Sequence, residues 1–475
     1  MKLVIGDEVN CKFVDLDVKT RNELNKKFKF KLPYAHHLPA VRLGRWDGTV
    51  SFFDVAGRSF VKLLDQIVPM LVENGIEFDI EDSRASHEFE FPEVTADINA
   101  HIMWPEGHKL AGQPIILEDH QVLAINEFLK NPQSIQQLAT GAGKTILTAT
   151  ICRIIDQKTL VIVPNKDLVT QTESDFQLLG LDVGVYYGDR KQLGNKFLIT
   201  TWQSLSNIHK QRHEEVSKWA EVFLGLTAVI VDEAHSAKGP ELKKLLCGPL
   251  SHVPIRWGMT GTVPKDNFDY YHLLVSIGPV INQVSSKELQ DKGFLAGCSI
   301  SIIQYQDIKQ FRDYHEEHKW LTSDEERLNK IVPFIENVVK TGNTLLLVTN
   351  IGTGKHFQEA IKDSVFVSGA MASKKRKEHY TDVNTTDNML VIATSGVAAV
   401  GLNIPRLFNI ILFEPGKSFV RVIQSIGRGL RKAHDKDFAT VYDITSSCKY
   451  SKKHLTKRKE YYREAGFPFT ITKVD

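Results

Sequence analysis

Short apolar runs alternate with longer amphipathic segments along the chain from about residue 115 onward. The first series of runs consists of Ser134–Leu138, Thr159–Val163, Phe197–Thr201, Thr227–Asp232 and Arg256–Thr262. Runs of this length suit strands, and continuous apolar character is typical of strands covered on both faces of a parallel sheet. Because helical segments separate them, the runs predict βαβ units and an α/β fold.

A second series of apolar runs follows an interruption at 285–296. It comprises Thr344–Val348, Met389–Ala393, Ile410–Phe413 and Ala439–Tyr442, each with a helical stretch after it. A chain of 475 residues is too long for a single core. The two series therefore predict two α/β domains, 109–284 and 285–475, each with a parallel sheet flanked by helices.

The first 108 residues follow a different pattern, with short alternating runs such as Thr49–Phe53. The basic segment Lys19–Lys31 and the segment Leu63–Asn74 are predicted to be helical, so residues 1–108 are expected to form a small α+β domain. The expected linker to the next domain is marked by Pro92, Pro105, Gly107, Gly112 and Pro114.

The segment Leu138–Thr145 has the sequence of a phosphate-binding loop between a strand and a helix. Its residues Thr140, Gly141, Ala142 and Gly143 are expected to direct backbone N–H groups at phosphate oxygens, aided by the helix dipole. Lys144 is then expected to reach the β- and γ-phosphates, and the Thr145 hydroxyl to ligate Mg²⁺. Leu138 stands where such loops usually have a first glycine, and an ordinary strand-to-helix turn is the alternative.

Two carboxylates, Asp232 and Glu233, follow a buried strand 88 residues after Lys144. Open α/β sheets bind their ligands at the carboxyl ends of their strands. Asp232 is expected to hold Mg²⁺, and Glu233 to orient or deprotonate the attacking water. Together with the loop, the two acids predict a site that hydrolyses a nucleoside triphosphate, with ATP and Mg²⁺ as the expected cofactors.

Other polar residues at strand ends and helix starts extend this candidate site. Gln121, 23 residues before Lys144, is a candidate for contacting the adenine edge. Arg428 and Arg431 are three residues apart, hence on one face of a predicted helix, and are candidate arginine fingers or surface charges. Candidates for contacting a nucleic-acid backbone, or for coupling it to the nucleotide, are Pro164, Gln171, Thr201, Gln203, His235, Thr260, Thr262 and Thr394.

Charge is unevenly distributed, although the net charge is only +2. Residues 1–62 carry 12 Lys/Arg and 7 Asp/Glu, residues 63–110 carry 2 and 11, and residues 417–475 carry 14 and 6. Such segregation favours local contacts with nucleic acid. At the N-terminal turn Arg42–Gly48, one interpretation is that Arg42, Arg45 and Trp46 contact a duplex backbone; the other is that Trp46 belongs to the core and the charges are solvated.

The remaining composition indicates a cytoplasmic protein. With 42% hydrophobic and 24% charged residues, the chain has no apolar run near the ~20 residues of a membrane span. The segment Met1–Glu8 reaches acidic residues too soon for a secretory signal. The five cysteines are far apart, which favours reduced core thiols over a disulfide framework or a zinc site. The oligomeric state is left open, and a monomer is compatible with the predicted site.

The loop, Asp232–His235, Thr260-Gly-Thr262 and Gln424-x-x-Gly-Arg428-x-x-Arg431, in this order within about 115–445, resemble the motifs of superfamily-two helicases. The resemblance implies two RecA-like lobes with ATP between them. It assigns nucleotide binding to Gln121, Gly401 and Gln424 as well as to the loop. Thr260 and Thr262 would couple the ATP state to lobe movement. Two residues depart from the usual motifs, Glu118 near Gln121 and Asn403 near Gly401.

The small N-terminal domain with its Arg45-Trp-Asp-Gly48 turn further resembles the phage UvsW-type helicases, which remodel branched DNA. This resemblance implies Holliday-junction branch migration, fork regression and D-loop or R-loop unwinding in recombination, replication and repair. It also implies DNA as the partner and the bacterial host cytoplasm as the location. Two alternatives stay open: an RNA helicase, and a nucleic-acid-binding protein that ATP only gates.

Overall fold

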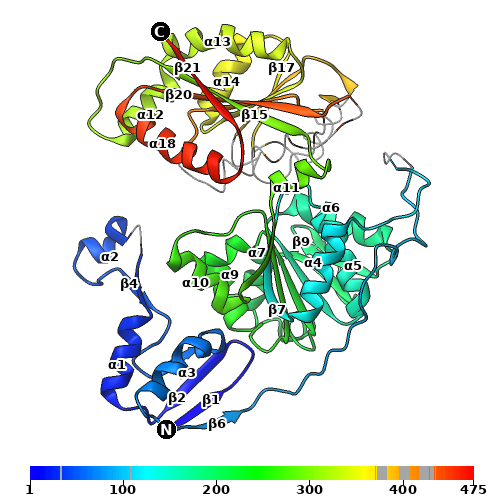
Figure 1. Cartoon of the computed structure of the whole chain (residues 1–475), viewed down its shortest axis with the longest axis vertical. Helices are drawn as coiled ribbons and strands as arrows, with labels where there is room; N and C mark the ends of the chain where they lie inside the picture. The colour runs from blue at the N-terminus through cyan, green and yellow to red at the C-terminus, as the bar shows by residue number, and fades with distance from the viewer. Residues whose placement is uncertain are drawn as a thin grey trace. The chain divides into compact units, whose positions relative to one another are not determined.

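The chain forms two compact units in a computed structural model that describes residues 1–32, 35–106, 110–369, 371, 382–383, 385–394, 404, 406–416, 427, 430, 433 and 435–475 (Figure 1). The first unit comprises Met1–Gln137 and Lys144–Gln283. The second comprises Leu138–Gly143 and Val284–Asp475. The predicted α/β class, with two mainly parallel sheets flanked by helices and a small N-terminal α+β part, is confirmed.

The N-terminal part of the first unit is built on a four-stranded mixed sheet. Its order is β5 (Arg58–Phe60), β2 (Asn10–Val14), β1 (Lys2–Ile5) and β6 (Asp79–Asp82), and β1 pairs with β2 antiparallel and with β6 parallel. Helices α1 (Val18–Lys27), α2 (Pro39–Arg42) and α3 (Leu64–Glu73) accompany it. The side chain of Asp17 accepts a hydrogen bond from Thr20 N, 2.9 Å away, and so caps the start of α1.

The predicted helix over Lys19–Lys31 is right only as far as Lys27. Residues Lys29–Lys31 form strand β3, which pairs antiparallel with β4 (Thr49–Ser51). In a strand, Phe30 lies on the face opposite its two lysine neighbours, and its ring packs 5.7 Å from that of Phe52. Tertiary packing of this one ring therefore overrides the helical pattern.

The N-terminal core includes one helix of the neighbouring α/β fold, α10 (Asn267–Ser276). The Phe52 ring lies 5.5 Å from that of Tyr271 and 5.0 Å from that of His272. The Tyr271 hydroxyl donates a 2.8 Å hydrogen bond to the side-chain oxygen of Gln66 in α3. Residues from 1 to 78 and α10 thus bury their apolar side chains in a common cluster.

An eight-stranded sheet forms the centre of the first unit. Its order is β10 (Arg190–Lys191), β9 (Val183–Tyr187), β11 (Phe197–Thr201), β8 (Thr159–Val163), β12 (Ala228–Asp232), β13 (Ile255–Thr260), β7 (Gln133–Leu138) and β14 (Val280–Val284). The neighbours from β9 to β7 are parallel, so their carboxyl ends share one edge. Strands β8 and β11 are buried at every position, as their continuous apolar sequences predict.

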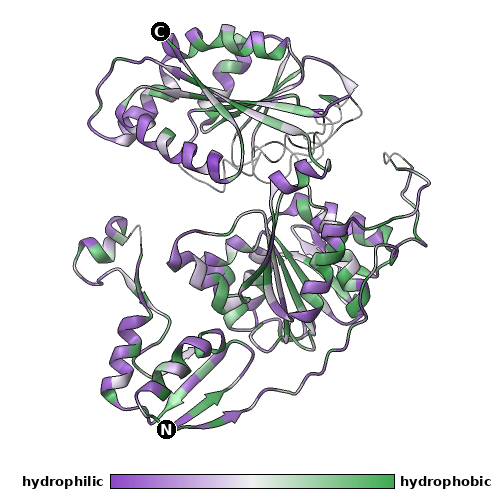
Figure 2. Cartoon of the chain, in the orientation of Figure 1, coloured by the Kyte–Doolittle hydropathy of each residue, from purple (hydrophilic) through white to green (hydrophobic). Residues whose placement is uncertain are grey.

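Helices cover both faces of this sheet (Figure 1). On one face lie α4 (Asp119–Lys130), α5 (Lys144–Ile155) and α6 (Lys166–Leu178), and on the other lie α7 (Trp202–Lys210), α9 (Pro240–Cys247) and α10. Helix α8 (Val216–Phe223) precedes β12. Figure 2 shows the central strands in the green of apolar residues and much of the helical surface in the purple of polar ones. The apolar side chains are therefore concentrated between sheet and helices, as the pattern of the sequence requires.

The second unit contains a seven-stranded sheet. Its order is β17 (Ser364–Val367), β18 (Leu390–Thr394), β16 (Thr344–Val348), β19 (Asn409–Phe413), β20 (Phe438–Ser446), β15 (Gly297–Tyr305) and β21 (Phe469–Val474), with every neighbouring pair parallel. Figure 1 shows α13 (Glu325–Val339) and α14 (Ile351–Ala360) on one side of these strands and α18 (Lys449–Glu464) on the other. Helices α11 (Ser286–Asp291) and α12 (Tyr314–Ser323) flank β15 in sequence.

A buried ionic network joins helices to strand ends in the second unit. The Arg327 guanidinium contacts the Glu414 carboxylate, lies 3.1 Å from the Asp307 carboxylate, and donates to Leu321 O at 2.7 Å. In the same unit Arg458 of α18 contacts Asp443 through two hydrogen bonds, of 2.8 and 2.9 Å. Since buried charges are retained only when they are paired and hydrogen-bonded, the network fixes α13 and α18 on the sheet.

In none of the described segments is a helix both long and apolar enough to cross a lipid bilayer.

Candidate active site

The predicted phosphate loop connects β7 to α5 and has the backbone of a tight turn. Gly141 has φ +91° and Gly143 has φ +77°, values in the left-handed region that favours glycine. The Ala142 N–H donates to Ala139 O at 3.1 Å, which closes the turn. Helix α5 begins directly after it at Lys144. The loop thus has the two glycines at the positions where the chain needs them, at a helix N-terminus suited to anions.

The two predicted carboxylates lie at the carboxyl end of β12, a central strand between β8 and β13. Asp232 is the last residue of the strand, and Glu233 follows it with φ +51°. Lys144 Nζ lies 3.5 Å from Glu233 Oε1, and both side chains are largely buried, at 15% and 20% exposure. The structure therefore brings Lys144, Asp232 and Glu233 together in the first unit.

The electrostatics of Asp232 suit a cation. Burial raises the pKa of Asp232 to about 6, an effect that the Glu233 carboxylate strengthens and Lys144 opposes. Because its surroundings disfavour the ionised form of this carboxylate, a cation bound beside it would stabilise that form. Asp232 and the half-buried Thr145 also supply the oxygen donors that Mg²⁺ prefers. Thr145 and Asp232 thus fit a Mg²⁺ ion bound together with a nucleoside triphosphate.

A series of polar contacts leads from Glu233 to the Thr260–Thr262 segment. His235 Nδ1 lies 3.3 Å from Glu233 Oε2 and 2.9 Å from Thr260 Oγ1. The Thr260 hydroxyl also donates to Thr262 O, at 2.9 Å. Thr260 and Thr262 are almost fully buried, at 0% and 1% exposure. This arrangement physically connects the acidic strand end with the segment after β13.

Gln121 has a structural contact that the sequence analysis missed. It is the third residue of α4, and its side-chain oxygen accepts a 3.0 Å hydrogen bond from Glu118 N. The Glu118 side chain in turn accepts from the backbone at Gln121, so the two residues form a capping box. Only half of the usual signal is present in the sequence, because Gln is typical of the third helical position of a capping box, whereas Ser, Thr, Asp or Asn is usual where Glu118 stands. Adenine contact by Gln121 stays a prediction.

The candidate nucleic-acid contacts of the first unit lie near one edge of its sheet. Val163 and Thr201 are partners in the register of β8 and β11, so Pro164 and Thr201 lie side by side at the carboxyl ends. The Thr201 hydroxyl caps α7, accepting from Ser204 N at 3.3 Å. Gln171 and Gln203 are exposed on the helices that follow. In the second unit Thr394 ends β18.

At the N-terminal turn the basic and the aromatic side chains differ in exposure to solvent. Arg42 and Arg45 are exposed. Trp46 is half-buried, packs against the N-terminal core, and donates a 3.0 Å hydrogen bond from Nε1 to Thr49 O. The indole therefore stabilises the turn that presents the two arginines.

The remaining predicted site residues belong to the second unit and lie outside the described residues. They are the candidate arginine fingers and the candidate nucleotide contacts of the fifth and sixth motifs: Arg428, Arg431, Gly401, Asn403 and Gln424.

Comparison with known families gives two matches. Residues 114–265 match the model described as "Type III restriction enzyme, res subunit", and residues 325–433 match "Helicase conserved C-terminal domain". The first match contains the loop, the two carboxylates and Thr260–Thr262, and the second contains Arg428 and Arg431.

Individual proteins are similar over different lengths. The ATP-dependent DNA helicase uvsW of Enterobacteria phage T4 is 24% identical over 478 residues, which cover 94% of this chain and 91% of that protein. The DNA 3'-5' translocase XPB2 of Sulfurisphaera tokodaii is 30% identical over 179 residues, 38% of each chain.

Among solved structures, S. cerevisiae Dbp5 bound to RNA and ADP BeF3 aligns with a TM-score of 0.57 at 14% identity, covering 76% of this chain and 91% of that one. At this identity the likeness concerns the fold. The order of the motifs agrees with the two family matches and with the two parallel sheets. The chain therefore belongs to the superfamily-two helicases, and it is an ATP-dependent helicase or translocase.

Proposed function

We propose that this protein is an ATP-driven DNA helicase that remodels branched DNA, by branch migration of Holliday junctions, fork regression and unwinding of D-loops or R-loops. The observation that carries the proposal is the length of the match to the phage DNA helicase, 94% of this chain. That match extends beyond residues 114–433, the range of the two family models, and so takes in most of the N-terminal part.

In this proposal the residues of the loop and of the β12 end divide the work of hydrolysis. The N–H groups of Thr140–Gly143 and the ammonium group of Lys144 bind the phosphates. Thr145 and Asp232 would hold Mg²⁺, which neutralises phosphate charge when it is bound. Glu233, whose carboxylate lies 3.5 Å from Lys144 Nζ, orients the attacking water and accepts its proton. Gln121, Gly401 and Gln424 complete the nucleotide contacts.

Movement along the nucleic acid requires that the structural change on ATP hydrolysis be transmitted to the strand-binding loops. The series of polar contacts from Glu233 through His235 to Thr260 provides such a connection within the first unit. Arg428 and Arg431 are proposed as the arginine fingers, which stabilise the charge on the transferring phosphate.

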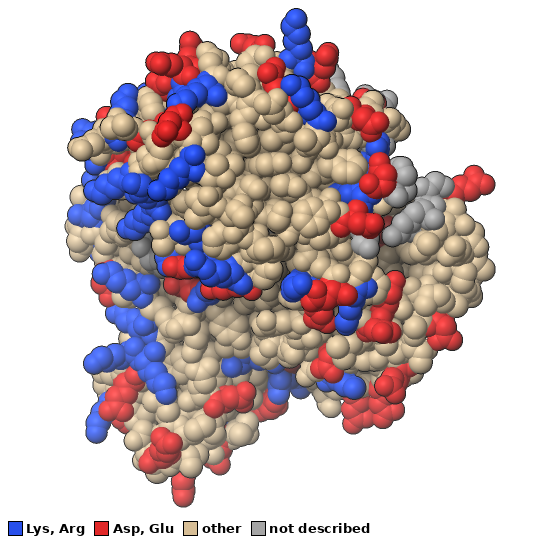
Figure 3. Space-filling model, turned by 45° about the horizontal axis from the view of Figure 1, so that its top comes forward, with Lys and Arg blue, Asp and Glu red and all other residues tan. Residues whose placement is uncertain are grey.

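The proposed strand contacts are sequence-independent. Pro164, Gln171, Thr201, Gln203 and Thr394 lie at or after strand ends and offer backbone N–H groups, amides and hydroxyls to phosphate and sugar oxygens. Arg42 and Arg45, which Trp46 holds in place, are proposed to contact the duplex of a branched substrate. Lysine and arginine side chains gather in several groups on the face shown in Figure 3, with acidic side chains beside some of them.

The test is ATP hydrolysis by the full chain with single-stranded DNA, duplex DNA, a fork, a four-way junction and a matched RNA, combined with a strand-displacement assay. We expect the fork and the junction to stimulate hydrolysis most and to be remodelled. Lys144→Ala is the control that should remove turnover on every substrate. Stronger stimulation by RNA would favour an RNA helicase, and ATP-dependent binding without displacement would favour a gated binding protein; either result contradicts the proposal.

A further inference from the structure

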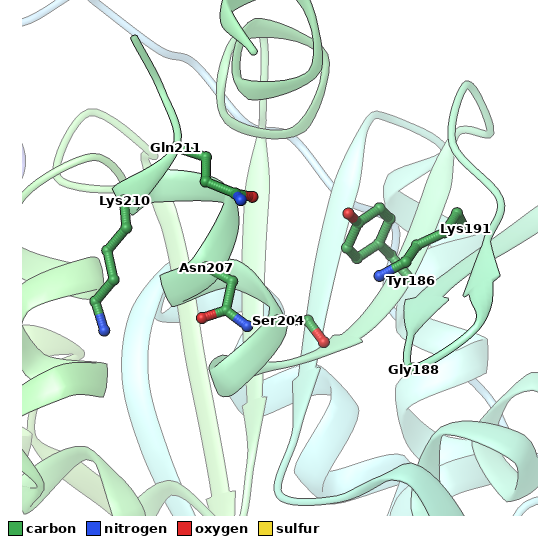
Figure 4. Close-up of a pocket in the computed structure, with 7 residues that line it drawn as sticks. All are labelled: Tyr186, Gly188, Lys191, Ser204, Asn207, Lys210 and Gln211. Carbon is green, nitrogen blue, oxygen red and sulfur yellow. The ribbon is translucent and has the colours of Figure 1, made fainter. Parts of the chain in front are cut away.

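A cavity of the first unit lies between the β9–β10 hairpin and α7 (Figure 4). Its volume is about 580 Å³, and its lining residues are Tyr186, Gly188, Lys191, Ser204, Asn207, Lys210 and Gln211. This volume falls within the range of about 300–1,000 Å³ that is usual for pockets that bind small molecules.

The lining of this pocket is rich in hydrogen-bond donors and contains no acidic side chain. Lys191 Nζ lies 4.2 Å from the centre of the Tyr186 ring, so a cation–π contact holds the ammonium group at the pocket. In Figure 4 the Gln211 amide extends toward the side formed by Tyr186 and Lys191, whereas Lys210 points away from it. Lys210 Nζ lies 3.7 Å from the Glu241 carboxylate. Lys191 is therefore the lining cation that makes no ion pair within the described residues, while Lys218, which is paired with Glu215, interacts with the neighbouring Tyr186.

Three of these groups have their polar atoms available for a ligand. Within the described part of the chain, the side-chain amides of Asn207 and Gln211 make no hydrogen bond, and the Lys191 ammonium makes no ion pair. One cation and two amides, without a carboxylate, suit an anion that also carries hydrogen-bond donors and acceptors. A metal ion is a poor match, because its usual carboxylate ligands are missing.

The pocket adjoins the edge at which the strand contacts are proposed. Helix α7 begins directly after Thr201, and the Ser204 hydroxyl in the pocket wall lies 3.1 Å from the Thr201 hydroxyl. Strand β9, which carries Tyr186, is the parallel neighbour of β11. The pocket and the Thr201 loop therefore share one end of adjacent strands.

We propose that this pocket binds one nucleotide unit of the nucleic-acid strand, with the phosphate against Lys191 and the base edge against Asn207 and Gln211. The inference rests on the proposed function, since it assumes that a strand crosses this edge. Tyr186 acts as a positioning residue, because its ring supports Lys191. A base held in this way is withdrawn from its neighbours, which gives the first unit a grip on single-stranded rather than paired regions.

The test measures binding of a fluorescent oligothymidylate to the full chain as a function of salt. Lys191→Ala should lower the slope of log K against log salt by about 0.7, the value for one phosphate contact on a single strand. Asn207→Ala combined with Gln211→Ala should weaken binding about tenfold without changing the slope, since neutral hydrogen bonds release no counterions. Tyr186→Leu should resemble Lys191→Ala, and Tyr186→Phe should resemble the wild type.

The matched control is Lys196→Ala, which removes an exposed cation next to the other end of β11 and should leave the slope unchanged. Basal ATP hydrolysis should be unaltered in every variant, and so should Tm in every variant except Tyr186→Leu, which shrinks a buried side chain of the core. If the Lys191 variant and the Asn207/Gln211 variant bind like the wild type, the inference about the pocket is wrong. If the wild type binds no nucleic acid, the proposed function is wrong instead. Equal occupancy by free thymidine monophosphate or inorganic phosphate, without strand contact, would also overturn the inference.

Discussion

The imidazole Nδ1 of His235 lies 2.9 Å from the hydroxyl oxygen of Thr260. The two residues belong to different strand ends, since His235 follows β12 and Thr260 ends the neighbouring strand β13. His235 Nδ1, which also lies 3.3 Å from Glu233 Oε2, is thereby hydrogen-bonded to the hydroxyl of the fully buried Thr260. Any shift of the acidic strand end must move one partner of this hydrogen bond or break it.

This contact predicts non-additive variants. His235→Ala and Thr260→Ala should each lower DNA-stimulated ATP hydrolysis and leave most basal hydrolysis intact, because the carboxylate proposed to activate water, Glu233, is retained. The double variant should be no worse than the single ones, with a coupling energy of about 1 kcal/mol in the double-mutant cycle. Thr260→Ser, which keeps the hydroxyl, is the matched control. Strict additivity in stimulated rate would show that the two side chains act separately.

Glu233→Gln should separate nucleotide binding from hydrolysis. The substitution removes the carboxylate proposed to activate water and leaves Asp232 in place. We expect ATP to bind with near wild-type affinity, measured with a fluorescent analogue, while turnover falls by at least about 10². Loss of ATP binding in this variant would mean that the roles of the two carboxylates must be exchanged.

Asp232→Asn should stabilise the nucleotide-free protein while it abolishes hydrolysis. Because the folded-state pKa is about 6 and the unfolded value is near 4, the ionised carboxylate opposes folding. The stabilising contribution of this group is complete below pH 4, is lost as the pH rises to 6, and stays lost above it. The variant should therefore gain about 3 kcal/mol in free energy of unfolding at pH 8 and almost nothing at pH 4.

The pH dependence is checked by measuring Tm of the variant and the wild type across that range. Asp156→Asn, at an exposed position, is the control and should show no such trend. A gain in Tm that does not vary with pH would assign the effect to packing.

Arg42→Ala combined with Arg45→Ala should weaken binding to forked DNA without unfolding the N-terminal part. Both side chains are exposed, so their loss should leave Tm unchanged and reduce the salt slope by about 2, for two duplex phosphate contacts. Trp46→Ala should instead lower Tm, since the indole packs on the core and donates to Thr49 O. Unchanged fork affinity and slope in a stably folded double variant would exclude these arginines from the DNA-binding surface.

The Arg327–Glu414 contact predicts a rescue. Arg327→Met alone should cost about 3–5 kcal/mol in free energy of unfolding, because it leaves Glu414 and Asp307 buried without their cation. Adding Glu414→Gln should recover part of that loss, since one of the two uncompensated charges is then removed. Denaturant unfolding of the two variants measures the difference. An equal loss in both would indicate that the aliphatic stem of Arg327, rather than its charge, carries the stability.

Most of the elements, and the acidic strand end, were predictable because each depends on local sequence. Strand β8 is continuously apolar and proved to be buried throughout. The segment Gly352–Lys355 has the Gly-x-Gly-Lys spacing of a phosphate loop but no Ser or Thr after the lysine, and it lies inside α14. Whether a residue near the end of an element lies in a helix or in a strand depends, by contrast, on partners far away in sequence. Phe30 lies in a strand because its ring packs against Phe52 and Tyr271.

Contacts between distant residues were less predictable than the elements and the members of the site. Arg256 was expected only as a strand residue, yet it is 1% exposed and donates to the carbonyl oxygens of Leu246, Leu250 and Ser276. The His235–Thr260 hydrogen bond depends on the register of two strands that are separated by α9. The pocket residues between Tyr186 and Gln211 are individually ordinary, and only the pairing of β9 with β11 brings them together.

The aromatic cluster around Phe52 bears on how this protein can be divided or recombined. Tyr271 and His272 complete the N-terminal core, although they lie in a helix that directly follows the segment carrying Thr260 and Thr262. A chimaera that exchanges residues 1–82 between relatives would separate ring faces that are fitted to each other, unless α10 were transplanted as well. The unit of exchange is therefore discontinuous in sequence, and compatible substitutions on its two sides are expected to arise in pairs.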